Sequence, residues 1–205
     1  MTRRRHLTEV QLATLFDPPT DPRELVRHYT LSAADLAMIR SCRGDQNRLG
    51  FALMLSYLRH PGRPLRIGEQ PPSALVSFVA AQIDVLPEAL AGYLNSERAI
   101  RRHATEWQTR LGLRPYGPRP AADLVQWLLP QAIENDRFAH LAALIMEECR
   151  RRRVVTPSPR MLERLCIEVR HQARREVHRR LTDRLSADQR RRLDALTERR
   201  EDTGL

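Results

Sequence analysis

Six basic side chains of this chain share one face of a single predicted helix. Wound at 100° per residue, they fall within about 60° of the first; they are Arg160, Arg164, His171, Arg174, Arg175 and His178. Apolar residues of the same segment fall on the opposite side. Arginine donates paired hydrogen bonds to phosphate and to guanine edges in the major groove. This basic stripe predicts DNA binding, against the alternative of an ordinary solvated face.

The positive charge of the chain is concentrated around this stripe. All 35 basic residues other than histidine are arginines, with no lysine, which codon usage in a GC-rich genome explains. Codon usage does not explain their distribution. Residues 150–192 hold 15 arginines and five acidic residues, a net +10 that equals the charge of the whole chain, whereas residues 1–100 reach only +2. Such concentration is typical of nucleic-acid-binding proteins.

The segment before the stripe predicts a helix-turn-helix-like unit. A predicted helix ends in four arginines, Arg150, Arg151, Arg152 and Arg153. A short turn with Pro157 follows, and Ser158 as N-cap with Pro159 at the first position begins a long basic helix that runs to about Leu185. In this arrangement the second helix lies in a major groove.

The rest of the chain is also predicted to be helical. Thr8 with Gln11 and Ser32 with Asp35 have the spacing of capping boxes. The segment 46–59 is apolar around most of its circumference, as expected of a central helix. Residues 113–120 are rich in proline and glycine and predict a linker. The expected architecture is all-α, with an N-terminal helical subdomain at 1–112, this linker, and a basic DNA-binding subdomain at 121–205.

Other kinds of site are not expected. Cys149, Cys166 and His171 lack the close ligand pair of a structural zinc site, so the two cysteines are predicted to be core thiols. His171 and His178 lie roughly 10 Å apart along a helix, too far to share a metal. The sequence has no glycine-rich phosphate loop and no nucleophile elbow. We expect no catalytic residue, no metal and no cofactor.

Several segments resemble Tn-three-family transposases, which belong to class II replicative transposons. The most specific is RGDQNRLGFA at residues 43–52, continued by YLRHPGR at 57–63. Upstream RHYTLS at 27–32, and downstream RRRVV at 151–155, PSP at 157–159, LERL at 162–165 and RRLT at 179–182, fit the same pattern. The resemblance extends over nearly the whole chain.

The resemblance implies a helical N-terminal region that recognises the terminal inverted repeats of a transposon during DNA transposition and recombination. The family's magnesium-dependent Asp-Asp-Glu centre lies in the C-terminal part, to which no segment here corresponds. The chain is therefore expected to be a fragment, a truncated reading frame or a stand-alone protein that binds DNA and is not itself an enzyme. A free module of this kind could compete with the full enzyme for transposon ends.

Further expectations concern additional DNA contacts, binding partners and location in the cell. Arg3, Arg4 and Arg5 are candidates for a DNA-contacting arm, with a disordered terminus as the equal alternative. Gly44 is interpreted as a C′ turn, with Asp45 and Asn47 organising the start of the buried helix. For Asn47 and Arg48, contact with DNA is the second interpretation after a structural role. The expected partner is double-stranded DNA, with self-association as a further candidate. A basic helix that binds an acidic protein, and RNA binding, remain alternatives. No membrane span is expected, and the predicted location is the bacterial cytoplasm at the nucleoid.

Overall fold

The computed structural model describes residues 6–197, and within this range it is built from α-helices and one short 3-10 helix without strands. The predicted all-α class is confirmed. The first half contains α1 (Glu9–Phe16), α2 (Pro22–Tyr29), α3 (Ala33–Arg40), α4 (Asp45–Arg59), α5 (Ser73–Gln82), η1 (Pro87–Ala89), α6 (Leu90–Leu94) and α7 (Glu97–Arg110). The second contains α8 (Pro118–Glu134), α9 (Phe138–Arg151), α10 (Pro159–Thr182) and α11 (Ala187–Thr197).

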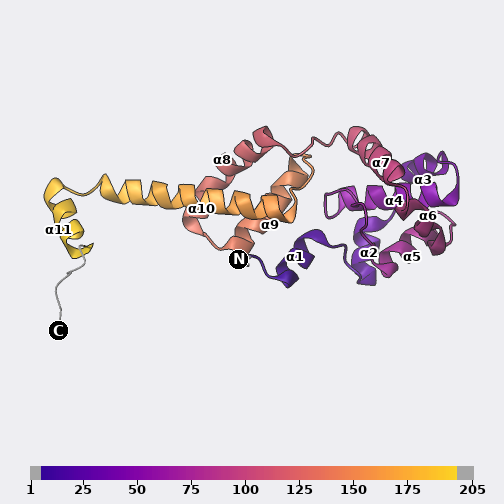
Figure 1. Ribbon diagram of the computed structural model, residues 1–205, viewed down its shortest axis with the longest axis horizontal. Helices are drawn as coiled ribbons and strands as arrows, with labels where there is room; N and C mark the ends of the chain where they lie inside the picture. The colour runs from indigo at the N-terminus through magenta and orange to yellow at the C-terminus, as the bar shows by residue number, and fades with distance from the viewer. Residues whose placement is uncertain (1–5, 198–205) are drawn as a thin grey trace.

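The molecule is elongated and has two hydrophobic cores. In Figure 1, α2 to α7 gather at one end, α8 and α9 lie beside them with the first part of α10, and α10 then extends past both toward α11. The first core is formed by residues from α2 to α7. The second is formed by α8, α9 and α10 together with Leu7, which precedes α1, and Phe16, the last residue of α1.

Helix α4 is the centre of the first core, as its apolar circumference predicts. All ten residues from Leu49 to Leu58 are buried. Trp107 of α7 stacks on Phe51, with ring centroids 4.4 Å apart, and its Nε1 donates to the Phe51 carbonyl oxygen at 2.8 Å. Gly50 allows the ring of Tyr93 to lie directly on the α4 backbone, where a Cβ atom would overlap it.

The packing of α1 differs from the sequence-based division, which grouped residues 1–112. Leu7 and Phe16 are 2% and 4% exposed and belong to the second core, because α1 packs against α9. Sequence periodicity does not reveal this, since a short helix carries no information about which of two cores will cover it. Independent folding of two subdomains with the boundary at 113–120 stays a prediction.

Buried Arg63 joins the two cores. Its guanidinium is bound to Glu69 through two hydrogen bonds of 2.7 and 2.6 Å, and its Nε donates to the carbonyl oxygen of Phe16 at 3.1 Å. The side chain of Arg63 also lies over the Tyr57 ring, 5.0 Å from the centroid. The loop after α4 is thereby attached to the end of α1 and so to the second core.

The predicted linker is more ordered than its composition suggested. Arg114 pairs in parallel with the 153–155 segment, donating to the Arg153 carbonyl at 2.8 Å and accepting from the Val155 N–H at 2.9 Å. Pro118 and Pro120, assigned to the linker, lie in the first turn of α8. The first turn tolerates proline because its N–H groups have no partner within the helix.

A helix-turn-helix unit is not confirmed. Residues 152–158 connect α9 to α10, which is longer than the three- or four-residue turn of that motif. Arg153, two residues after the end of α9, has a positive φ of 53°, and the Val154 N–H donates back to the Cys149 carbonyl at 2.8 Å. Ser158 and Pro159 begin α10 as predicted, but α10 packs chiefly on α8.

Gly50→Ala is expected to lower the free energy of unfolding by about 1–3 kcal/mol, because the new methyl group must displace a buried aromatic ring. Gly92→Ala is the matched control, since its methyl group would meet only the end of the exposed Gln46 side chain. That control should be neutral or stabilise by up to about 1 kcal/mol through helix propensity. Urea unfolding measures both, and equal effects would contradict the proposed packing of Tyr93.

Candidate nucleic-acid interface

Helix α10 presents the basic stripe to solvent. Its buried side forms part of the second core through Leu162, Leu165, Cys166, Val169 and Ala173. The stripe residues are all exposed, as the sequence predicts: Arg160, Arg164, His171, Arg174, Arg175 and His178. Anchoring one side of α10 therefore fixes the direction in which the basic side chains face.

The members of the stripe differ in how far their charge is compensated. Arg174 lies 3.4 Å from Asp136, a carboxylate that Arg170 also contacts at 3.2 Å. Arg160, Arg164 and Arg175 have no carboxylate within 4.0 Å among the described residues. These three guanidinium groups are the ones available to an external anion without first breaking an ion pair.

Beyond the stripe, much of the positive charge is neutralised locally. Glu176 receives hydrogen bonds from both Arg179 and Arg180, which hold its pKa low, at about 2. Asp188 similarly pairs with Arg191 and Arg192. The sequence-based net charge of residues 150–192 therefore overstates what the far end of α10 and α11 offer to a ligand, and the uncompensated part of the stripe lies before residue 176.

The arginine run at the end of α9 divides into two kinds. Arg151 and Arg152 both donate to the carboxylate of Glu148, which is 3% exposed, and Arg152 also lies over the Trp127 ring. Arg150 and Arg153 are exposed and make no ion pair among the described residues. Two of the four predicted contacts are thus engaged in holding a buried carboxylate, which sequence spacing did not reveal.

Two other predicted DNA contacts have different outcomes. Arg3, Arg4 and Arg5 lie outside the described residues. Asn47 Nδ2 donates to the Arg43 carbonyl at 3.0 Å, and Arg48 Nε donates to the Cys42 carbonyl at 3.1 Å. Both side chains therefore stabilise the turn before α4, which agrees with the structural interpretation.

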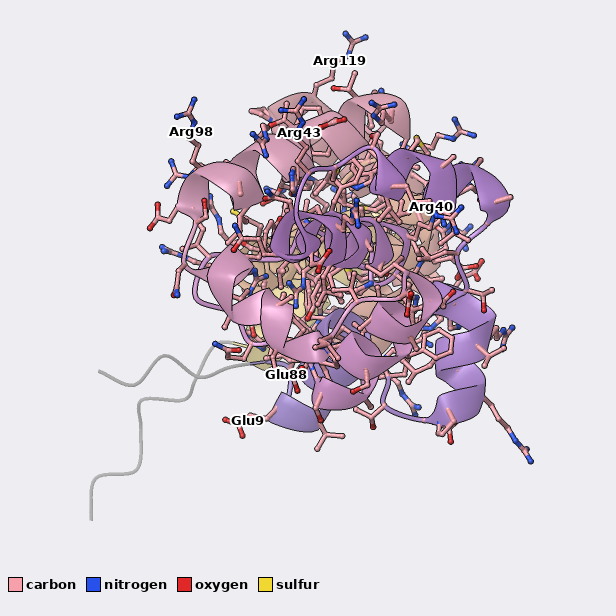
Figure 2. The ribbon with its side chains drawn as sticks, turned by 90° about the vertical axis from the view of Figure 1, so that its right-hand side faces the viewer. Glu9, Arg40, Arg43, Glu88, Arg98 and Arg119 are labelled. Atoms are coloured by element: carbon pink, nitrogen blue, oxygen red, sulfur yellow. The ribbon has the colours of Figure 1, made fainter. Side chains whose placement is uncertain are left out.

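A polar pocket that the sequence reading missed lies between the first turns of α4 and α7. We call it the α4–α7 pocket; it has a volume of about 410 Å³ and is lined by Gln46, Asn47, Gly92, Tyr93, Ser96, Arg98, Ala99 and Arg102. Figure 2 shows this end of the molecule, with Arg98 and Arg43 extending outward and Glu88 and Glu9 on the opposite side. The available signal was Arg98 and Arg102 spaced i, i+4 directly after a cap at Ser96.

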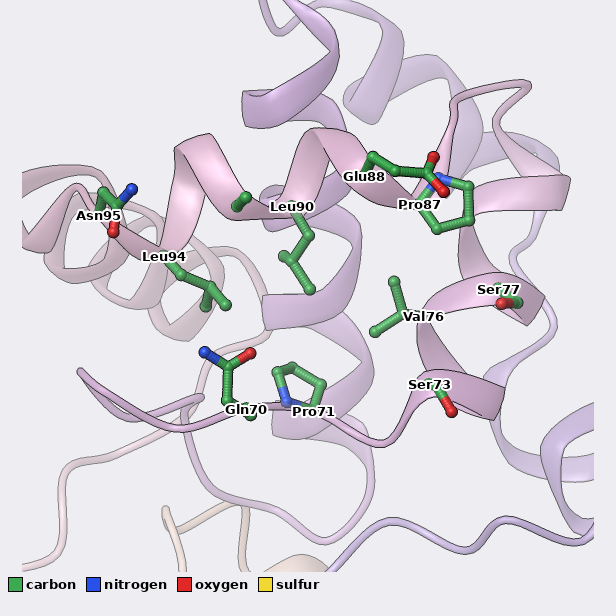
Figure 3. Close-up of a pocket in the computed structure, with 11 residues that line it drawn as sticks. Gln70, Pro71, Ser73, Val76, Ser77, Pro87, Glu88, Leu90, Leu94 and Asn95 are labelled. Atoms are coloured by element: carbon green, nitrogen blue, oxygen red, sulfur yellow. The ribbon is translucent and has the colours of Figure 1, made fainter.

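A second hollow lies between α5 and η1–α6 (Figure 3). It has a volume of about 390 Å³, apolar walls that include Val76, Leu90 and Leu94, and Glu88 as its one ionisable lining residue. This lining suits neither a phosphate nor a metal ion.

The cysteines behave as predicted core thiols. Cys149 and Cys166 are both fully buried, and burial raises the pKa of each thiol to about 12. Among residues 6–197, no single helix has the length and apolar character of a membrane span; the bent pair α5 and η1–α6 passes that test only together.

Comparison with known protein families places the chain in one of them. The chain belongs to the family described as "Domain of unknown function (DUF4158)", whose model matches residues 6–169.

Transposases are among the curated relatives of the chain. The chain is 36% identical over 201 residues to the transposase for transposon Tn3926 of Escherichia coli, covering 98% of this chain and 20% of that protein. It is 35% identical over 196 residues to the transposase for transposon Tn501 of Pseudomonas aeruginosa, covering 96% of this chain and 20% of the relative. The predicted resemblance to Tn-three-family transposases is confirmed, and the chain spans about a fifth of the length of these relatives.

Glu148→Gln is expected to lower the free energy of unfolding at pH 7 by about 1–3 kcal/mol, because charge-assisted hydrogen bonds to a buried group are weakened. Hydrogen bonds from Arg151, and then from Arg152, outweigh burial and hold the pKa of Glu148 below its usual 4.5. This stabilisation is present above the ordinary pKa and is lost as the pH falls through the folded-state value. Urea unfolding at neutral and acid pH should therefore show the two proteins converging in acid; a pH-independent difference would contradict this role.

Proposed function

We propose that the chain binds double-stranded DNA at the terminal inverted repeats of a transposon, through the basic stripe of α10. The observation that carries this proposal is the row of exposed basic side chains on one face of a helix whose other face is anchored in the second core. The relatives are transposases for transposons, and this supports DNA as the polyanion that the stripe binds. Arg150 and Arg153 extend the surface toward the start of α10.

The stripe provides two kinds of contact. Uncompensated guanidinium groups at Arg160, Arg164 and Arg175 suit phosphate oxygens, which position a protein on the duplex. His171 and Arg174, in the middle of the stripe, are placed to contact base edges, where sequence is distinguished. Arg174 must exchange its exposed ion pair with Asp136 for such a contact, and exposed pairs of this kind contribute little to stability.

Arg164→Gln combined with Arg175→Gln is expected to weaken duplex binding and to reduce the slope of log affinity against log salt by about two, because two phosphate contacts are lost. Fluorescence anisotropy with a labelled inverted-repeat duplex measures this. Arg179→Gln with Arg180→Gln is the matched control, since it removes the same charge from the same helix but from side chains already paired with Glu176.

An equal loss of affinity in both double variants would show that the stripe is not the DNA-binding site. A scrambled duplex of the same composition tests recognition of sequence: equal affinity for both duplexes at physiological salt would exclude specificity. Circular dichroism confirms that each variant retains its helical content.

The proposed activity is binding without strand transfer. In the family that the chain resembles, the Asp-Asp-Glu centre belongs to the C-terminal part, and this chain matches about a fifth of its relatives. Incubation of the purified chain with the inverted-repeat duplex and magnesium ions should leave the DNA uncut, and strand cleavage would overturn this part of the proposal.

A protein partner is the second candidate, favoured by one observation. Leu181, near the end of the part of α10 that extends past α8 and α9, is 61% exposed (Figure 1). Sedimentation velocity of the chain without DNA tests for self-association. A mass that rises with concentration, and that returns to the monomer in Leu181→Gln, would support a second copy of the chain as this partner; a constant monomer mass excludes self-association.

A further inference from the structure

The α4–α7 pocket brings together two helix N-termini. Helix α4 begins after Gly44, which has no side chain to accept from the first-turn N–H groups, and α7 begins after the N-cap Ser96. The N-terminal end of a helix favours negative charge, through its unpaired N–H groups and its dipole. Residues of both first turns, among them Asn47 and Arg98, line the same cavity.

The charged side chains that line this cavity are two arginines, and the acidic residues of the two first turns, Asp45 and Glu97, pair with other arginines. Arg98 and Arg102, one turn apart on α7, are exposed and have no carboxylate within 4.0 Å among the described residues. Their neighbours on the same helix differ: Arg101 pairs with Glu97 and Arg110 with Glu106, each at 2.9 Å. No acidic residue is among those that line the pocket.

One wall of the pocket contains a buried polar group without a partner. Tyr93 is 1% exposed, and no described residue forms a hydrogen bond with its hydroxyl group. The ring of Tyr93 stacks on His103, whose Nε2 lies 3.2 Å from Arg102. Tyr93 therefore forms part of the pocket wall, while its hydroxyl group is closed off from solvent.

We propose that the α4–α7 pocket binds a phosphate group, held by Arg98 and Arg102 and approached by the Ser96 hydroxyl. Two guanidinium groups one helical turn apart can donate hydrogen bonds to the oxygens of one phosphate. The phosphate comes either from a DNA backbone or from a free anion. The first source rests on the proposed DNA binding; the second does not.

Thermal unfolding tests whether the pocket binds free inorganic phosphate. Inorganic phosphate, compared with chloride at equal ionic strength, should raise the Tm of the wild-type chain, because a ligand that binds only the folded state stabilises it. Arg98→Gln combined with Arg102→Gln should lose this shift. Arg101→Gln with Arg110→Gln, which removes the same charge from the same helix, should keep it.

Fluorescence anisotropy with the labelled duplex, measured in phosphate-free buffer, tests whether the pocket binds a phosphate of the DNA backbone. Loss of one phosphate contact in Arg98→Gln/Arg102→Gln should lower the salt slope by about one, while the Arg101→Gln/Arg110→Gln control retains the wild-type slope. The Arg164→Gln/Arg175→Gln variant, measured beside them, reports on α10 separately.

Loss of the Tm shift, or a lower salt slope, in the pocket variant and not in its control supports phosphate binding. The Tm assay identifies a free anion as the source, and the anisotropy assay identifies the DNA backbone. If the pocket variant and its control behave alike in both assays, the inference is overturned, even where the α10 variant confirms DNA binding. If the α10 variant binds as the wild type does and the pocket variant does not, the stripe is excluded and the pocket remains. Circular dichroism of every variant excludes unfolding as the cause.

Discussion

The structure depends on one buried ion pair between Arg63 and Glu69. A charged group in the interior is unfavourable unless it is paired and hydrogen-bonded, and here Glu69, the Phe16 carbonyl and the Tyr57 ring surround the guanidinium. Because Phe16 lies in the second core and Tyr57 in the first, this arrangement forms only when both cores are in place. The adjacent Gly62 carbonyl accepts from Thr156 at 2.9 Å, so the same loop also orients the segment that leads into α10.

This attachment has a consequence for both basic surfaces. The stripe belongs to α10, whose inner side packs in the second core, and the α4–α7 pocket belongs to helices of the first core. They lie on different parts of an elongated molecule, and the loop at Arg63 connects the bodies that carry them (Figure 1). Packing around Arg63, together with the backbone pairings of Gly62 with Thr156 and of Arg114 with residues 153–155, therefore sets the relative position of the two surfaces.

Features governed by local chemistry could be predicted from the sequence. Capping residues such as Ser158 gave the start of α10, and helical periodicity correctly placed Arg164 and His171 on its exposed side. Features governed by tertiary contacts could not. The spacing of Arg151 and Arg152 gives no sign that buried Glu148 engages both, and the proline-rich segment at 113–120 gives no sign that Arg114 pairs with the chain after α9. The α4–α7 pocket arises only when two separate helix ends meet.

The straightness of α10 sets a limit on how it can meet a duplex. Its 24 residues span roughly 36 Å at 1.5 Å each, about one full turn of B-form DNA. A major groove curves away from a straight rod well within that distance, so the whole helix cannot follow the base edges. The middle of α10 can approach bases while its two ends diverge toward opposite phosphate strands, unless the duplex bends toward the protein. The cost of bending DNA, which varies with base sequence, would then contribute to site selection at base pairs that no side chain touches.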